Sequence, residues 1–247
     1  MYLTAIVITA VLLSGYSLLI LLYRKWYLQL PLFRIEPDIE PVTFFSIIIP
    51  ARNEEENIRQ CLQSVLWQHY PSALFEVIVI NDHSTDQTEN LIREMQAKHD
   101  NLQLINLADY IQGKQLNAYK KKAIELAIGT SKGNWIVTTD ADCLVSTEWL
   151  KAINAYIVKK QPVFVAAPVM FTHKNSFLSL FQLLDFLSLQ GITAASVSAG
   201  YHTMCNGANI AYQKEAFYTA GQFQGIDQLA SGDDMLLMHK IFGLYPE

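Results

Sequence analysis

The sequence predicts an α/β protein with a mainly parallel sheet covered by helices, preceded by one membrane-spanning helix. Three observations lead to this prediction. An apolar segment without a charged residue opens the chain, short strand-like runs then alternate with helical patterns, and the predicted strands end in polar and acidic residues. Such alternation of strand and helix is typical of a sheet whose strands run in one direction.

The composition is that of a folded protein, because 51% of the 247 residues are hydrophobic and only 17% are charged. This length leaves room for one domain of ordinary size with a small appendage. The formal net charge of −5 provides no basic surface, so nucleic acid is not expected as a partner. The widely spaced Cys61, Cys143 and Cys205 indicate a reducing compartment and argue against a zinc site.

Residues 1–23 are expected to form a transmembrane anchor. They contain no charged residue, and Arg24 and Lys25 follow at once. Twenty-three helical residues span roughly the 30 Å of a bilayer core. A cleaved signal peptide carries its positive charge before the apolar stretch, which is the reverse order. The positive-inside rule then places the rest of the chain on the cytosolic face of the cell membrane. A buried core helix is the less favoured alternative.

A proline-containing linker over residues 24–43 is expected to lead into one domain over residues 44–247. Apolar, β-branched runs predict strands at 44–50, 75–80, 102–106 and 135–139. Helical spacing of apolar residues predicts helices at 54–68, 86–98, 114–128 and 147–158. A further apolar helix at 176–191 is expected in the core. The alternative is an interfacial helix that faces the bilayer and suits a lipid-linked acceptor.

The predicted strands end in residues suited to cation binding. Acidic side chains follow the first, second and fourth strands, at 51–54, 81–86 and 140–142. Ligands of such sheets bind beyond the carboxyl ends of the strands, and carboxylates that converge there repel one another unless a cation lies among them. The pattern therefore predicts a divalent metal that holds a diphosphate. Asp82 and Asp86 could instead be turn formers and helix caps, and a single D-x-D is weak by itself.

Two basic segments bear on phosphate binding. Gly113-Lys114 enters a predicted helix and could present N–H groups and an ammonium to phosphate, although the full P-loop pattern is absent from the sequence. The run Lys120-Lys121-Lys122 is expected to be a solvated helix face rather than a phosphate cradle.

Six segments, in order, resemble the family 2 inverting glycosyltransferases over about residues 44 to 243. They are 46–55, 79–86, Gly113-Lys114, 138–143, 206–209 and 231–234. The resemblance implies the GT-A fold, a Rossmann-like mixed and mainly parallel sheet flanked by helices. It also implies a nucleotide-sugar donor, expected to be UDP-linked, a bound Mg²⁺ or Mn²⁺, and transfer with inversion to a lipid or glycan acceptor.

The resemblance assigns the donor side by position. The residues expected to bind the nucleotide sugar are Pro50, Ala51, Glu54, Asp82, Lys114 and Asp140. Among them, Asp82 is expected to hydrogen-bond the base, and Lys114 to approach the diphosphate or the base. Asp142 is expected to coordinate the metal, and Asp140 to contact the ribose or the metal shell.

On the acceptor side, the resemblance implies Asp234 as the catalytic base. Asp233 stands where the family has Glu and is the second candidate. The alternative for this acidic pair is N-capping of a helix, where acids interact favourably with the dipole. Gly207, Ala208 and Asn209 are expected to shape the acceptor side.

The sequence departs from the processive members of the family, because it has no Q-x-x-R-W element downstream of Asp234. We expect a C-terminally truncated chain, or else a minimal acceptor half. Two alternative functions stay open. One is a membrane-anchored sugar-nucleotide-binding protein without transferase activity. The other is a nucleotidyltransferase, for which the acidic segment 51–55 is a poor match.

Overall fold

The computed structural model describes residues 2–36, 39–111, 117–172 and 176–246. The chain divides into two compact units. A helical unit comprises residues 1–32 and 168–204, and a sheet unit comprises residues 33–167 and 205–247. The domain boundaries expected from the sequence, after residues 23 and 43, stay predictions.

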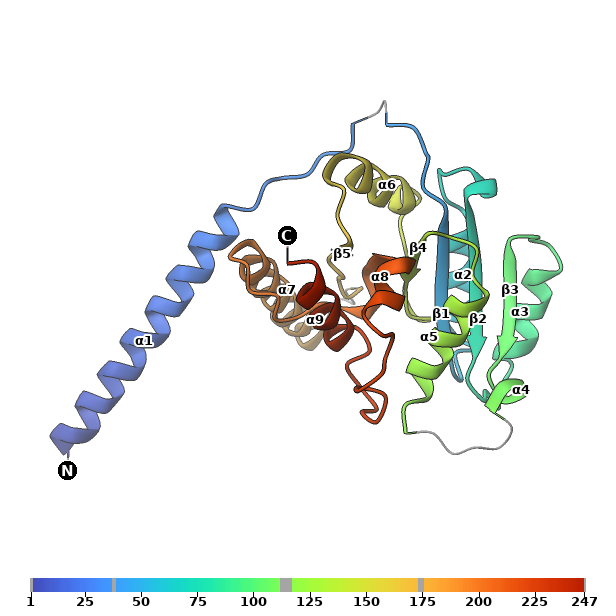
Figure 1. The fold of residues 1–247 in the computed structure, drawn as a ribbon. Coiled ribbons are helices and arrows are strands. Elements are labelled where there is room, and N and C mark those ends of the chain that lie inside the picture. The colour runs from blue at the N-terminus through green and yellow to red at the C-terminus, as the bar shows by residue number, and fades with distance from the viewer. Residues whose placement is uncertain (1, 37–38, 112–116, 173–175, 247) are drawn as a thin grey trace. The chain divides into compact units, whose positions relative to one another are not determined.

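The sheet unit is built on a sheet with strand order β3-β2-β1-β4-β6-β5 (Figure 1). The strands are β1 (Phe45–Ala51), β2 (Phe75–Asn81), β3 (Leu102–Asn106), β4 (Trp135–Thr138), β5 (Phe164–Ala166) and β6 (Ile210–Gln213). The first four are parallel, whereas β6 runs antiparallel to both β4 and β5. The predicted mainly parallel sheet is therefore confirmed. The strands β5 and β6 were not predicted from the sequence, because neither is a long run of apolar, β-branched residues such as those that predict the other strands.

Helices cover both faces of this sheet. They are α2 (Ile58–Leu66), α3 (Thr88–Gln96), α4 (Ala108–Ile111), α5 (Tyr119–Thr130), α6 (Trp149–Lys160), α8 (Lys214–Thr219) and α9 (Met235–Leu244), with 3-10 turns η1 (Ser72–Leu74) and η2 (Gly207–Asn209). Alternate β1 side chains enter opposite cores, because successive residues of a strand face opposite ways. Ile47 and Ile49 pack with α2, α3 and α6, whereas Ile48 packs with α5, α8 and α9.

The helical unit contains α1 (Tyr2–Leu28) and α7 (Phe177–Ser198), which pack against each other. Both are long and apolar enough to cross a membrane by length and composition. The expected core position of the second apolar helix is wrong, since α7 buries only Ala195 and Ser196. Its apolar composition indicates an apolar environment, which need not be the protein core.

A buried polar network joins three strands at the amino end of the sheet. Ser46 Oγ donates to Glu76 Oε1 at 2.6 Å and accepts from Gly133 N at 2.8 Å. The backbone N–H of Lys132 donates to the same carboxylate oxygen at 2.5 Å. A Cβ at position 133 would lie 2.6 Å from Ser46 N and from Ser46 Oγ. Glycine is therefore required where the chain enters β4.

We predict that Gly133→Ala lowers the free energy of unfolding by about 3 kcal/mol, because the added methyl group collides with backbone and with the Ser46 hydroxyl. The matched control is Gly129→Ala in α5, where a Cβ meets nothing within 4 Å. That substitution is expected to raise the free energy by about 0.5–1 kcal/mol. Urea unfolding measures both values, and equal stability of the two variants would contradict the role of Gly133.

Candidate functional site

A hollow of about 330 Å³ lies where β1, β2 and β4 end. It is lined by Pro50, Ala51, Arg52, Glu54, Asp82, Lys120, Asp140, Ala141 and Asp142. The residues predicted to bind the donor or the metal thus lie together at the carboxyl ends of the strands, as far as the structure describes them. Lys114 lies outside the described residues. We call this hollow the acidic hollow.

Side chains of the loop after β2 hold the backbone of the loop after β1. The N–H groups of Asn53 and Glu54 donate to Ser84 Oγ at 3.0 Å and to Thr88 Oγ1 at 2.7 Å. Asp86 accepts from the N–H of Glu55 at 3.1 Å and, with its other oxygen, from the N–H of Thr88 at 3.0 Å. The turn role expected for Asp86 is confirmed, whereas the N-cap position of α3 is occupied by Gln87. These bonds fix the rim of the hollow beside Glu54.

Asp82 is buried, and its carboxylate has two basic neighbours. One oxygen lies 2.7 Å from His83 Nδ1, and the other lies 3.8 Å from Arg52 Nη1. The ring of Tyr119 meets that of His83 edge-on, with centroids 5.6 Å apart. Asp82 is therefore held in a fixed position at the hollow.

A lysine ammonium lies between the acid that follows β4 and the acidic pair at the start of α9. Lys120 Nζ is 3.1 Å from Asp140 Oδ1 and 3.4 Å from Asp233 Oδ2. Burial opposes the charge of this ammonium, but Asp233 and Asp140 outweigh that effect and raise the pKa of Lys120. Lys120 therefore supplies part of the positive charge that the converging carboxylates require.

The solvated face expected for the lysine run is wrong for two of its members. Lys120 lines the acidic hollow and Lys121 is buried, whereas Lys122 is exposed and pairs with Glu125 at 3.1 Å. A signal for Lys120 was available in the sequence. It lies in the first turn of a helix that follows a parallel strand. Such a helix begins near the carboxyl end of the strand, which is where ligands of these sheets bind.

Asp140 and Asp142 provide the hard oxygen ligands that Mg²⁺ and Mn²⁺ prefer. Burial raises the pKa of the Cys143 thiol to about 11, and the negative charges of Asp142 and Asp140 add to this effect. Among the described residues, no group of three or more His, Cys, Asp or Glu is arranged to hold a metal. A phosphate-bound Mg²⁺ takes only one or two carboxylates from the protein, so this pair fits a metal shared with a diphosphate.

Asp234 is fixed by two backbone N–H groups. It is the N-cap of α9, where Oδ1 accepts from Met235 N at 2.6 Å, and Oδ2 accepts from Gly207 N at 2.8 Å. Thr138, at the end of β4, donates to the carbonyl of Gly207 at 2.6 Å. The capping alternative therefore holds for Asp234, whereas Asp233 pairs with Lys120. Capping places the Asp234 carboxylate without excluding a chemical role for it.

The three residues expected on the acceptor side have different surroundings. Gly207 lies against Asp234, since a Cβ there would be 3.3 Å from the Cβ of Asp234. Ala208 is buried, and the Oδ1 atom of Asn209 accepts from Trp149 Nε1 at 2.9 Å. The structure thus brings Gly207 to the acids, while Ala208 and this Asn209 contact belong to the packing around η2.

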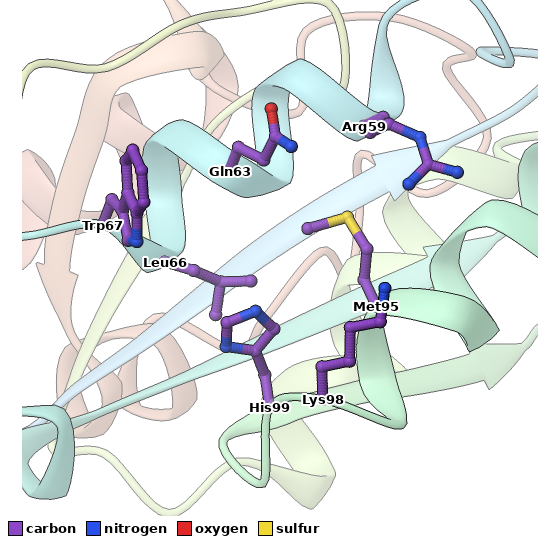
Figure 2. A pocket seen from close by; sticks show the side chains of 7 residues that line it. All are labelled: Arg59, Gln63, Leu66, Trp67, Met95, Lys98 and His99. Carbon is purple, nitrogen blue, oxygen red and sulfur yellow. The ribbon is translucent and has the colours of Figure 1, made fainter.

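A second hollow, of about 270 Å³, lies between α2 and α3 (Figure 2). It is lined by Arg59, Gln63, Leu66, Trp67, Met95, Lys98 and His99. No carboxylate is among these lining residues, and Arg59 is already paired with Glu94 at 2.7 Å. This hollow lacks the ligand set of the acidic hollow.

Known proteins are similar to this chain over the segment that contains the residues of the acidic hollow. The family described as glycosyl transferase family 2 matches residues 46–220. Glycosyltransferase AglE of Haloferax volcanii is 28% identical over 192 residues, which cover 78% of this chain and 59% of that protein. The chain therefore spans less than two thirds of the length of this relative.

Two solved structures share the fold. One is mannosyltransferase PcManGT from Pyrobaculum calidifontis in complex with GDP-Man and Mn²⁺, with a TM-score of 0.70 at 20% identity over 94% of this chain and 61% of that one. The other is S. aureus TarS 1-349 in complex with UDP-GlcNAc, with a TM-score of 0.57 at 22% identity over 81% of this chain and 53% of that one. The mixed sheet and these neighbours confirm the expected GT-A fold.

We predict that Lys120→Met tightens the binding of free Mn²⁺ by about tenfold, because it removes an ammonium that competes with a cation for Asp140. Lys122→Met is the matched control, since it removes a neighbouring charge that pairs with Glu125 of the same helix and does not line the acidic hollow. Calorimetric titration with MnCl₂ measures the affinity. Equal affinities of the parent and Lys120→Met would show that no cation binds beside Asp140.

Proposed function

The chain belongs to glycosyl transferase family 2, and from this membership and the acidic hollow we propose that it transfers a sugar from a nucleotide-sugar donor to a lipid or glycan acceptor, with inversion. The observation that carries the proposal is the meeting of Asp82, Asp140, Asp142 and Lys120 in one hollow. Family membership also weakens the nucleotidyltransferase alternative.

We assign the donor to the acidic hollow. Asp82 would accept a hydrogen bond from the nucleobase, and Pro50, Ala51 and Glu54, which line the same hollow, would contact the nucleotide. The similar proteins were solved in complex with GDP-Man and with UDP-GlcNAc, so both UDP and GDP are reasonable probes. A UDP-linked donor remains our first expectation from the resemblance.

Asp142, together with Asp140, would hold Mg²⁺ or Mn²⁺ beside the diphosphate. When bound, the cation neutralises the charge that develops on the departing nucleoside diphosphate. Lys120 adds an ammonium on the same side, since its Nζ already lies 3.1 Å from Asp140 Oδ1. The acidic side chains that line the hollow still outnumber Lys120 and Arg52, so a dianionic leaving group at this place requires the bound cation.

Asp234 would act as the base. Its carboxylate would take the proton of the acceptor hydroxyl as that oxygen forms a bond to the anomeric carbon and the bond to the phosphate breaks. The carboxylate of Asp233 is already paired with Lys120, whereas that of Asp234 is oriented by the N–H groups of Gly207 and Met235.

We place the helical unit in or on the cell membrane, with the sheet unit on the cytosolic face. This placement is supported by the length and apolar character of α1 and α7, and by Arg24 and Lys25 near the end of α1. The side chains of Phe177, Phe181 and Leu184 on α7 are exposed, which suits contact with lipid. A lipid-linked acceptor would then meet the enzyme at the membrane surface.

We predict that UDP or GDP binds the chain only when Mn²⁺ or Mg²⁺ is present. Asp142→Ala is expected to weaken this binding by about 100-fold or more, since the diphosphate loses its shared cation. Asp234→Ala is expected to leave the affinity within about twofold and to lower kcat by about 10²- to 10⁴-fold, because it removes the base. Calorimetry and donor turnover measure the two effects.

Asp100→Ala is the control, because Asp100 is an exposed acid outside the residues that line the acidic hollow. Failure of both nucleotides to bind with metal would refute the proposal for this chain. Binding without turnover of UDP-GlcNAc or GDP-mannose would favour the sugar-nucleotide-binding alternative.

We also predict that a benzophenone amino acid in place of Leu184, in chain reconstituted in lipid nanodiscs, forms photoadducts with phospholipid. The same amino acid in place of Leu144 serves as the control, because Leu144 is equally exposed but belongs to the sheet unit. Mass spectrometry of the labelled peptides detects the adducts. Equal lipid labelling at the two positions would contradict the membrane placement of α7.

A further inference from the structure

The lysine that follows Lys120 is buried and holds backbone rather than carboxylates. Lys121 is only 2% exposed, and its Nζ donates to the carbonyl oxygens of Ile226, Leu229 and Ser231 at 2.7, 2.8 and 2.9 Å. An ammonium has three N–H donors, so these three carbonyls use all of them. Hydrogen bonds from a charged donor are stronger than neutral ones. One side chain therefore fixes three points of the segment before α9.

The last of these points adjoins the acidic pair. The carbonyl of Ser231 is bound by Lys121, and Gly232 then turns the chain with φ +76°. Asp233 follows and meets Lys120, and Asp234 follows and meets Gly207 N. The backbone that carries both carboxylates is thus fastened immediately before them.

The opening turn of α5 therefore contacts the acidic segment in two ways. Lys120 reaches a carboxylate directly, whereas Lys121 reaches the backbone that leads to it. The same turn contacts Asp140 through Lys120. Because adjacent helical residues point in different directions, one turn can hold a side chain and a loop at once.

We propose that Lys121 is a positioning residue for the reaction, which sets where Asp233 and Asp234 stand relative to Asp140. The inference rests on the proposed function for its consequence in catalysis. Without Lys121, three buried carbonyl groups lose their donor, and segment 226–234 is free to move toward water. The donor residues at the ends of β1, β2 and β4 keep their own contacts. Loss of Lys121 should therefore impair the chemical step more than the binding of nucleotide.

The contrasting case is Lys240 of α9, which fastens the preceding part of the same segment. Its Nζ donates to the carbonyls of Gln222 and Gln224 at 2.7 and 2.8 Å, and to that of Gly221 at 3.4 Å. These carbonyls lie farther along the chain from the acids than Ser231 does. Two ammonium groups thus divide the segment, and the one from α5 controls the end next to Asp233.

The test compares Lys121→Met and Lys121→Arg with the parent, using the full chain in detergent. Lys121→Met is expected to lower kcat by at least about tenfold, with the donor KM and the affinity for UDP or GDP with Mn²⁺ within about twofold. Amide hydrogen exchange in peptides over 226–236 should accelerate by at least about tenfold. Lys121→Arg should recover part of kcat, since a guanidinium donates to carbonyls but in a planar fork.

Lys122→Met is the matched control and should resemble the parent in every measurement. Unchanged kcat and unchanged exchange in Lys121→Met would overturn the proposal, and so would a parallel loss of nucleotide affinity and kcat. If Lys121→Met does not fold, Lys121→Arg decides, because parent-like kcat and exchange there would overturn it. If the parent binds neither UDP nor GDP in the presence of Mn²⁺, the proposed function fails. The exchange measurement then still tests whether Lys121 restrains segment 226–234.

Discussion

The ammonium of Lys120 stands between Asp140 at the end of β4 and Asp233 at the start of α9. Parallel strands end on the same side of the sheet, so the residues that follow them lie close together. Here those residues include carboxylates that repel one another. Positive charge and N–H donors must come from elsewhere in the chain. Lys120 comes from α5, and the donor to Asp234 comes from Gly207 in η2. Residues of α5, of η2 and of the start of α9 thus meet one electrostatic requirement where the parallel strands end.

The amino end of the sheet, where the parallel strands begin, contains a different set of polar contacts. Ser46, Glu76 and the backbone at Gly133 bind one another across β1, β2 and β4. This network supports a register in which Ile48 lies beside Ile78 and Thr138. Because the three strands start together, their acidic ends also come together. A buried network that chemistry does not use therefore supports the geometry of the edge that we assign to chemistry.

The sequence was sufficient to predict the parallel strands, and with them the meeting of Asp82, Asp140 and Asp142, because strand direction alone brings their ends together. It was insufficient for Lys121 and for the pairing of Lys120 with Asp233. A place in the first turn of its helix brings Lys120 near the ends of the strands, but the partners of both lysines near Asp233 lie about a hundred residues along the chain, so only tertiary structure reveals these contacts. The same limit applies to α7. Apolar composition shows that a helix avoids water but does not distinguish protein core from lipid.

The central claim is that the acidic hollow binds a nucleoside diphosphate through a metal at Asp142. Anomalous diffraction from crystals grown with UDP or GDP and Mn²⁺ tests it most directly. We predict one Mn²⁺ peak within bonding distance of an Asp142 carboxylate oxygen and of the diphosphate, with the nucleobase beside Asp82. A metal peak away from Asp142, or a nucleotide in the hollow between α2 and α3, would contradict it.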